Sequence, residues 1–399
     1  MIKITEKEAC CGCAACQQIC PKKCISMSAD EQGFLYPVVQ VESCIDCHLC
    51  EKVCPVINQN EAKEGPLFCY LAKTKDENTR AQSSSGGIFS EIANYILSKG
   101  GVVFGVRFDE NWQTVYDFAE SKETLAAFRG SKYVQAIPSI AYLQVQKYLN
   151  EGRKVLFTGT PCHVSGLNHF LRKTYVNLYT MDVVCHSITS PKVWTQYLSE
   201  IEDEYELKIY NISFRDKSKG WTNYSLRIDL KGLGERKKTI VETHFENAYM
   251  RGMTDDLYTR PSCAECPARN YKSCSDITIA DAWDINKYHP HINDEKGISH
   301  VLINTEKGIE LFQTIAPMLD SFLIDYVEVE PYSMHAPLTR SCKPSPYRNA
   351  FYERLKKEKN VSGLSNFFHY KYLLKKRIHR SIIFRIIRKI SKLFHHDSF

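Results

Sequence analysis

The sequence has no long hydrophobic run and no segment that resembles an export signal. No stretch approaches the ~18 apolar residues that a membrane-spanning helix needs. The first nine residues contain no apolar core of the kind found in signal peptides. We therefore expect a cytoplasmic protein. In that reducing compartment its 17 cysteines are expected to bind metals or to do redox work rather than to form disulfides.

Most of the chain has no net positive charge, although the formal net charge of the whole is +6. Residues 371–399 hold nine Lys or Arg and one acidic residue, and the other 370 residues carry 43 basic and 45 acidic side chains. A body that binds nucleic acid should show a basic footprint, so we expect no nucleic-acid partner. The length of 399 residues suggests two or three domains, and a hydrophobic content of 43% is ordinary for a globular protein with a core.

Two runs of cysteines with the same spacing lie near the N-terminus, and each ends in Cys-Pro. The spacing C-x2-C-x2-C-x3-C-P is that of bacterial ferredoxins with two [4Fe-4S] clusters, in which the fourth Cys of each run ligates the other cluster. Zinc takes four thiolates per ion and does not need eight interleaved ones. Cys11 and Cys24 fall outside the pattern and are expected to be buried thiols. We assign cluster one to Cys10, Cys13, Cys16 and Cys54, and cluster two to Cys44, Cys47, Cys50 and Cys20.

The rest of the chain predicts an α/β domain and a basic tail. We expect an α+β ferredoxin module over residues 1–60, a domain with a mixed sheet over 67–345, and a helical tail over 346–399. The clearest unit is a βαβ pattern from residue 154 to residue 184. Residues 382–394 form a basic amphipathic pattern, which indicates either contact with the inner face of a membrane or docking on protein.

A third group of cysteines lies within the second domain. Cys162 begins a predicted helix, and Cys185 follows the next strand, so both belong to one edge of a parallel sheet. Cys263 and Cys266 form a CxxC pair, and Cys274 follows eight residues later. On spacing alone, a third [4Fe-4S] cluster, a structural zinc site and unligated core thiols all remain open.

Several motifs in this domain are similar to those of one known family. They are Thr158-Gly-Thr-Pro-Cys-His-Val-Ser-Gly-Leu167, Val184-Cys-His-Ser-Ile-Thr-Ser190, Ser213-Phe-Arg-Asp-Lys-Ser-Lys-Gly-Trp221, Cys263-Ala-Glu-Cys-Pro267, Ser275-Asp-Ile-Thr-Ile-Ala-Asp281, Ser85-Gly-Gly-Ile88 and Arg129-Gly-Ser-Lys-Tyr133. Over about residues 1–345 the chain resembles the coenzyme F-420 hydrogenase/dehydrogenase beta-subunit family. The resemblance implies an iron–sulfur flavoprotein with FAD and a core cluster on Cys162, Cys185, Cys263 and Cys266, with Cys274 as the substitute ligand. It does not by itself imply use of the deazaflavin F-420.

FAD needs N–H groups for its pyrophosphate and polar contacts around its ring. Helix starts and short Gly/Ser loops offer such groups, although each is also an ordinary turn or cap. His163 and His186, each beside a predicted cluster ligand, and Lys132 are candidate acid/base groups, with structural hydrogen bonding as the alternative for the histidines. The candidate cofactor-binding residues are Ser85, Gly86, Gly87, Ser131, Lys132, Thr158, Gly159, Thr160, Lys219 and Asp281.

The sequence thus predicts an oxidoreductase that passes electrons from the double cluster through a core cluster to FAD. Its partners are expected to be an electron donor such as a ferredoxin and a small-molecule or protein acceptor. The alternative is a non-enzymatic electron-transfer subunit of a partner enzyme. Relatives often accompany surface-polysaccharide genes, so surface-polysaccharide metabolism is a candidate setting for this alternative.

Overall fold

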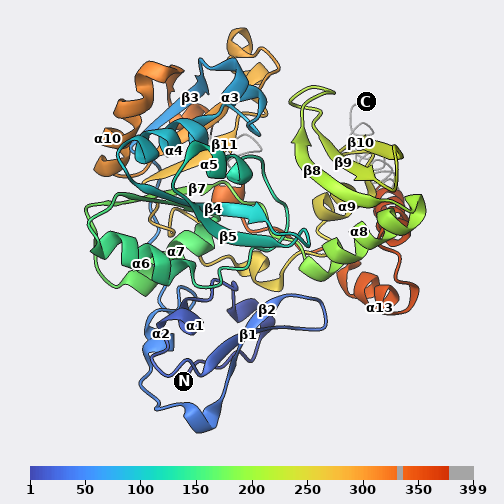
Figure 1. Cartoon of the computed structure of the whole chain (residues 1–399), viewed down its shortest axis with the longest axis horizontal. Helices are drawn as coiled ribbons and strands as arrows, with labels where there is room; N and C mark the ends of the chain where they lie inside the picture. Colours follow the sequence, from blue (N-terminus) through green and yellow to red (C-terminus); the bar gives the residue numbers. More distant parts are fainter. Residues whose placement is uncertain (330–335, 377–399) are drawn as a thin grey trace, which may run out of the picture.

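The computed structural model describes residues 1–329 and 336–376. The N-terminal segment forms a small module at the bottom of Figure 1. Its two strands pair antiparallel, with Ile25 opposite Val39, and its two short helices carry cysteines of the two runs. The predicted ferredoxin-type module is therefore present, and its elements are α1 (Ala15–Ile19), β1 (Ile25–Ala29), β2 (Leu35–Val39) and α2 (Leu49–Lys52).

A mixed eight-stranded sheet forms the centre of the molecule, with strand order β13-β3-β12-β11-β7-β6-β4-β5. Strands β4, β6, β7 and β11 are parallel neighbours, and β12 lies antiparallel between β11 and β3. The α/β domain with a mixed sheet is confirmed. Its strands are β3 (Phe68–Thr74), β4 (Val102–Phe108), β5 (Thr114–Ala119), β6 (Val155–Gly159), β7 (Leu178–Val183), β11 (Ile277–Asp281), β12 (Ser299–Ile303) and β13 (Leu319–Ile324).

Helices cover both faces of this sheet because alternate residues of its strands are apolar on both sides. Phe104 and Phe157 pack on one face with α6, α7 and cysteines of the ferredoxin module. Val103 and Leu156 pack on the other face with α4 and α10. Figure 1 shows these helices on opposite sides of the sheet. They are α3 (Glu77–Ala81), α4 (Ile88–Ser98), α5 (Lys122–Leu125), α6 (Ala141–Asn150), α7 (Pro161–Leu171) and α10 (Glu306–Ile315).

A second lobe, on the right of Figure 1, holds a separate antiparallel sheet of order β10-β9-β8. Trp194, Phe214 and Tyr249 are buried in its core, together with Phe351 and Phe368 from beyond residue 345. The first part of the predicted tail thus packs on this lobe, whereas the amphipathic pattern over 382–394 lies outside the described residues. The lobe contains α8 (Pro191–Tyr205), β8 (Lys208–Asp216), β9 (Ser225–Lys231), β10 (Lys237–Thr243), α9 (Ala248–Thr254), α13 (Arg348–Glu358) and the helical residues 361–376.

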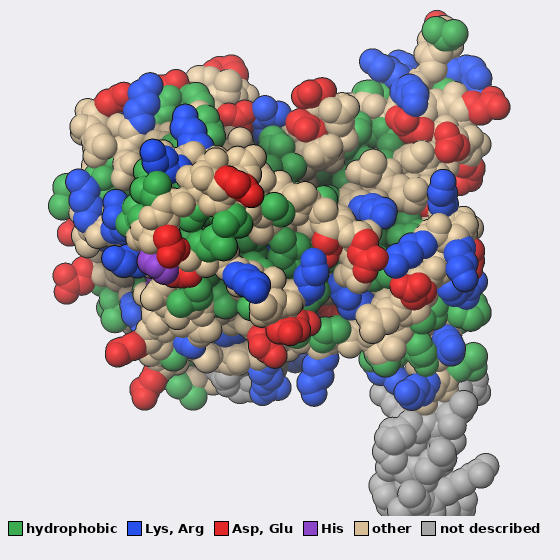
Figure 2. Space-filling view, turned by 90° about the horizontal axis from the view of Figure 1, so that it is seen from below, with side chains coloured by type: hydrophobic (Ala, Val, Ile, Leu, Met, Phe, Trp, Pro, Cys, Tyr) green, Lys and Arg blue, Asp and Glu red, His purple; other side chains and the backbone are tan. Residues whose placement is uncertain are grey.

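The surface carries acidic and basic side chains interspersed with exposed hydrophobic ones (Figure 2). Among the described residues, no helix combines the length and the apolar character needed to span a bilayer.

Candidate iron–sulfur and cofactor site

The predicted site residues gather at the carboxyl edge of the large sheet. Strands β3, β6, β7 and β11 run in the same direction, since β12 is antiparallel to both β3 and β11. Their carboxyl ends therefore share one edge, where ligand sites of α/β sheets collect. Ser85–Gly87 follows β3, Thr160 and Cys162 follow β6, Cys185 follows β7, and Asp281 ends β11.

One pocket at this edge is lined by five cysteines. Cys162 lies in the first turn of α7, where Pro161 takes the first helical position and leaves no donor unpaired there. Cys185 comes from the loop after β7, and Cys263 and Cys266 come from the short 3-10 helix η4 (Pro261–Glu265) and the residue after it. The fifth is Cys11 of the ferredoxin module. Cys274 is not among the residues that line this pocket.

The thiols in this pocket are crowded and poorly solvated. Burial, with the neighbouring Cys162 and Cys266, raises the pKa of Cys185. Burial and the nearby Cys185 likewise raise the pKa of Cys263 well above its usual range. Several thiolates in so small an apolar space repel one another unless a cation neutralises them. The donor set therefore fits a cluster held by four thiolates.

The second ferredoxin cluster site lies near the surface. Cys20, Cys44, Cys47 and Cys50 line one pocket, as the interleaved assignment requires. The Cys24 thiol also lines it, with its Sγ 3.4 Å from the Sγ of Cys20. Backbone N–H groups point at two of the ligands, from Ile2 to Cys50 Sγ (3.3 Å) and from Asp46 to Cys44 Sγ (3.4 Å). Such donors stabilise negative charge on a cluster.

The first ferredoxin cluster site is more deeply buried. Cys13, Cys16 and Cys54 are all buried. Burial, with the thiols of Cys10 and Cys54, raises the pKa of Cys16, so the side chains of Cys10, Cys16 and Cys54 lie together as the spacing predicts.

No three His, Cys, Asp or Glu side chains within residues 1–329 and 336–376 are grouped so as to hold a single metal ion.

Arg260 joins the ferredoxin module to the five-cysteine pocket, and the sequence alone gave no sign of it. This fully buried side chain donates to the carbonyls of Cys10 (2.9 Å) and Leu35 (2.9 Å). Its own carbonyl accepts from the backbone N–H of Cys263 at 3.1 Å. A ligand loop of cluster one and a ligand loop of the pocket are thus tied to a single residue.

A second buried arginine, Arg215, organises the predicted flavin region. It forms a bidentate ion pair with Asp281 (both 2.9 Å) and donates to the carbonyl of Ser84 at 2.9 Å. Its guanidinium lies over the rings of Tyr224 and Trp283, 4.3 and 4.8 Å from their centroids. Arg215 therefore brings the loop before α4 and the end of β11 together with an aromatic wall from two lobes.

The loop of Ser85, Gly86 and Gly87 is held from both sides. The N–H of Gly86 donates to Ser299 Oγ (3.0 Å), and a Cβ at this glycine would lie 2.4 Å from the Ala72 carbonyl. Gly87 adopts φ +87° directly before α4, a conformation that favours glycine. Ser131 donates its N–H to Ser84 Oγ at 2.9 Å, so the second predicted loop lies beside the first.

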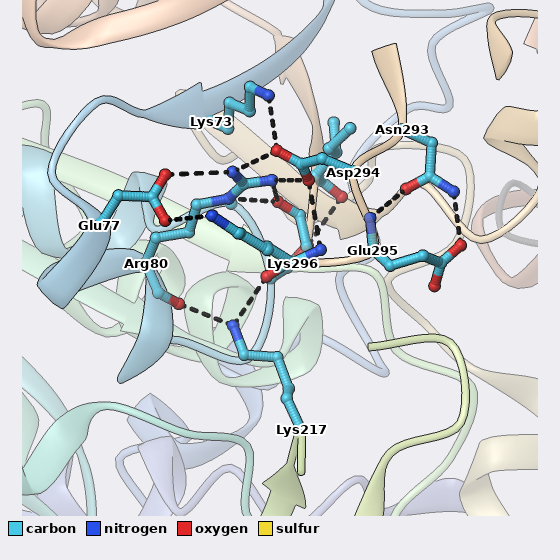
Figure 3. A network of polar contacts seen from close by, with 12 residues as sticks. Lys73, Glu77, Arg80, Lys217, Asn293, Asp294, Glu295 and Lys296 are labelled. Carbon is cyan, nitrogen blue, oxygen red and sulfur yellow. Dashed lines mark hydrogen bonds and ion pairs between the residues drawn. The ribbon is translucent and has the colours of Figure 1, made fainter. Parts of the chain in front are cut away.

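A polar network behind this loop is drawn in Figure 3. The buried Arg80 pairs with Asp294 and donates to the carbonyl of Gly297. Lys217, from the end of β8, donates to the carbonyls of Arg80 (2.7 Å) and Lys296 (2.9 Å). Burial and the nearby Arg80 lower the pKa of Lys217 to about 8. The network fastens the second lobe to helix α3 and to the loop before β12.

Other predicted residues have partners within the fold. Thr158 Oγ1 donates to the Phe104 carbonyl (2.9 Å), Thr160 Oγ1 lies 3.4 Å from Cys162 Sγ, and a Cβ on Gly159 would collide with the Tyr116 hydroxyl. Lys132 donates to the carbonyls of Ala127 and Arg129 (both 2.9 Å), and burial lowers its pKa to about 7. Lys219 pairs with Glu246 on the surface (3.1 Å).

The two candidate histidines differ in environment. His163 is buried, its Nδ1 lies 3.0 Å from the Tyr116 hydroxyl, and burial with the nearby Arg260 lowers its pKa to about 4. It is therefore neutral at pH 7. His186 is half exposed, lines the five-cysteine pocket and pairs with Asp256 at 3.0 Å.

The fold and these cysteine sites define an iron–sulfur electron-transfer protein in which a ferredoxin-type module is joined to an α/β domain. Residues 9–58 match a 4Fe-4S dicluster domain. Residues 69–144 and 152–320 match the N-terminal and C-terminal parts of the coenzyme F420 hydrogenase/dehydrogenase beta subunit. The chain belongs to this family, as its motifs predict.

A chain from the F420-reducing [NiFe] hydrogenase complex of Methanosarcina barkeri is similar to this one. The two share 16% sequence identity with a TM-score of 0.44, over 79% of this chain and 94% of the other. A search of curated proteins found no match.

Proposed function

We propose that this protein is an iron–sulfur flavoprotein oxidoreductase. In this proposal electrons pass from the two ferredoxin clusters to a core [4Fe-4S] cluster on Cys162, Cys185, Cys263 and Cys266, then to FAD and a substrate. The observation that supports this proposal most directly is that these four thiols line one pocket, which lies against the ferredoxin module. Bound clusters supply one-electron transfer, and a flavin links it to two-electron chemistry.

The proposed flavin site lies around Arg215. The helix α4 begins with N–H groups that have no acceptor within the helix, and these suit a pyrophosphate. Gly86 packs so closely on Ala72 and Ser299 that it admits no side chain, which fixes the position of this loop before α4. Tyr224 and Trp283, with Arg215 over both rings, provide an aromatic wall, and Lys132 provides an amine whose proton is readily lost near pH 7.

The test is anaerobic purification with iron, sulfide and flavin analysis. Three clusters predict about twelve irons per chain. Cys263→Ala should lower this by about four and remove one cluster signal. Cys69→Ala is the matched control, because Cys69 is a buried thiol of β3 that lines neither cysteine pocket. About eight irons in the unsubstituted chain, or bound zinc, would contradict the core cluster, and absence of flavin would contradict the FAD assignment.

A second candidate is an electron-transfer subunit that serves a partner enzyme. Val41 and Ile45, which flank Cys44, are more than half exposed, and Val38 and Ile57 of the same module are too. Exposed apolar side chains beside a redox site suit a protein partner. Flavin-free protein that passes electrons to an added redox protein but reduces no small molecule would support this candidate over the first.

A further inference from the structure

Five thiols line the core pocket, whereas a [4Fe-4S] cluster takes four. Four of them come from loops of the α/β domain. The fifth, Cys11, comes from the ferredoxin module, between the cluster-one ligands Cys10 and Cys13. It is buried, and it packs in one apolar group with Cys13 and Cys162.

The junction around Cys11 is closely packed. A Cβ on Gly166 of α7 would lie 2.8 Å from Cys13 Cβ and 3.0 Å from Cys13 Sγ, so the helix that carries Cys162 touches the cluster-one loop directly. Gly12 adopts φ +77°, and a Cβ there would lie 2.4 Å from Gln135 Nε2. Arg260 fixes the same loop through the Cys10 carbonyl.

The two ferredoxin cluster sites therefore differ in whether they contact the elements that form the core pocket. Cys13, a ligand of cluster one, contacts α7, which carries the core ligand Cys162. The pocket of cluster two is lined only by residues of the ferredoxin module, and its Cys47 is exposed. Cluster one is the neighbour of the core site, and cluster two faces outward.

We infer that electrons pass between the ferredoxin module and the core site through cluster one, and that Cys11 is the positioning thiol between them. The inference rests on the proposed core cluster. With clusters bound at these two sites, the chemistry supplied would be transfer of one electron from the reduced cluster one to the oxidised core cluster, with no bond made or broken. Cys11 lines the core pocket and packs in one group with Cys13 and Cys162, so its S–H would be a donor beside both sites, and a hydrogen bond from it to a cluster sulfur would stabilise the reduced state.

Cys24 provides a matched comparison within the same module. It is also a buried thiol outside the ligand pattern, and it lies beside a ligand, with its Sγ 3.4 Å from that of Cys20. Its pocket is that of cluster two. Cys24 should therefore influence cluster two and leave the core site unchanged.

The experiment compares Cys11→Ala, Cys11→Ser and Cys24→Ala in the full-length holoprotein. Iron content is measured first, then the reduction potential of each cluster by electron paramagnetic resonance in a potentiometric titration. The rate of core-cluster reduction is measured with reduced methyl viologen as the electron donor. We expect Cys11→Ala to retain all its iron, to shift the core potential to more negative values and to slow core reduction by about tenfold. Cys11→Ser keeps a hydrogen-bond donor at this position, so it should restore most of the core-cluster potential and most of the rate of core-cluster reduction.

Three results would overturn the inference. The first is a core potential and rate unchanged in Cys11→Ala, and the second is an equal effect in Cys24→Ala. The third is the loss of about four irons in Cys11→Ala, which would make Cys11 a ligand. If the unsubstituted chain itself holds only about eight irons, the proposed core cluster fails and the inference fails with it, so the two failures are distinguished.

Discussion

Replacing Arg260 with methionine should loosen the ferredoxin module from the α/β domain. Arg260 has no exposed surface and donates to two carbonyls of the module, those of Cys10 and Leu35. Methionine fills much of the space of the side-chain stem but donates no hydrogen bond. Each buried acceptor left unpaired costs ~1–3 kcal/mol, so the pair costs ~2–6 kcal/mol. The guanidinium also lies 4.4 Å from the Tyr36 ring, and losing this contact adds to the cost.

The assay is anaerobic chemical unfolding of the holoprotein, combined with hydrogen exchange of the backbone amides of residues 11–19. Faster exchange in this segment reports loss of docking, and the unfolding midpoint reports the free energy. Arg354→Met is the control, because Arg354 is exposed and none of its contacts reaches the ferredoxin module. It pairs with Glu358 one helical turn away, a contact worth ~0.3–0.5 kcal/mol, and lies over the Phe367 ring, a contact worth ~0.5–1 kcal/mol. If Arg260→Met lowers the free energy of unfolding by less than ~1 kcal/mol and leaves hydrogen exchange of residues 11–19 unchanged, the reasoning is refuted, because an exposed contact contributes no more than that.

Two further predictions concern the same junction. Gly166→Val places a side chain against Cys13, so we expect a lower iron content of the ferredoxin module. Ala350→Val, at an exposed position of helix α13, should retain its iron, and equal iron in both variants would contradict this view. The pKa of His163 is lowered from 6.5 to about 4, so the folded state binds fewer protons than the unfolded state between these values. The free energy of unfolding should therefore fall by up to ~3 kcal/mol as the pH drops through this range, and His163→Asn should flatten that dependence in unfolding measurements between about pH 7 and pH 4.5. An equally steep dependence in the variant would show that other groups cause it.

The sequence predicted those features that depend on local spacing. The two cysteine runs, the strand–turn–helix around Cys162 and the strand before Cys185 are each contained within a few residues, so periodicity and ligand spacing suffice to find them. The same reasoning merged β8, β9 and β10 with the main domain. A strand pattern does not say which sheet it joins, and here Trp194 and Phe351 supply a separate core for these strands. The short strands β5 and β12 were missed as well.

The residues that sequence reasoning missed act through contacts between distant segments. Arg215 lies inside a motif that was recognised, yet its role depends on Asp281 and Ser84, more than 60 residues away on either side. Arg260 lies three positions before Cys263, but nothing in the sequence distinguishes it, because its role depends on carbonyls of the distant ferredoxin module. Cys11 was expected to be a buried thiol, and it is buried. Nothing local shows that it lies beside Cys162.

The dispersal of the core cysteines over a hundred residues follows from the sheet. Because β6 and β7 are adjacent and parallel, the residues after their carboxyl ends meet although Cys162 and Cys185 are 23 positions apart. The CxxC pair reaches the same place through Arg260, whose N–H donates to the Ile188 carbonyl in the loop that follows Cys185. Because Arg260 also holds the Cys10 carbonyl, the loop that closes the core pocket is the loop that docks the ferredoxin module. A change that displaces this loop should therefore disturb cluster one and the core site together, whereas cluster two, at the far side of the module, should keep its properties.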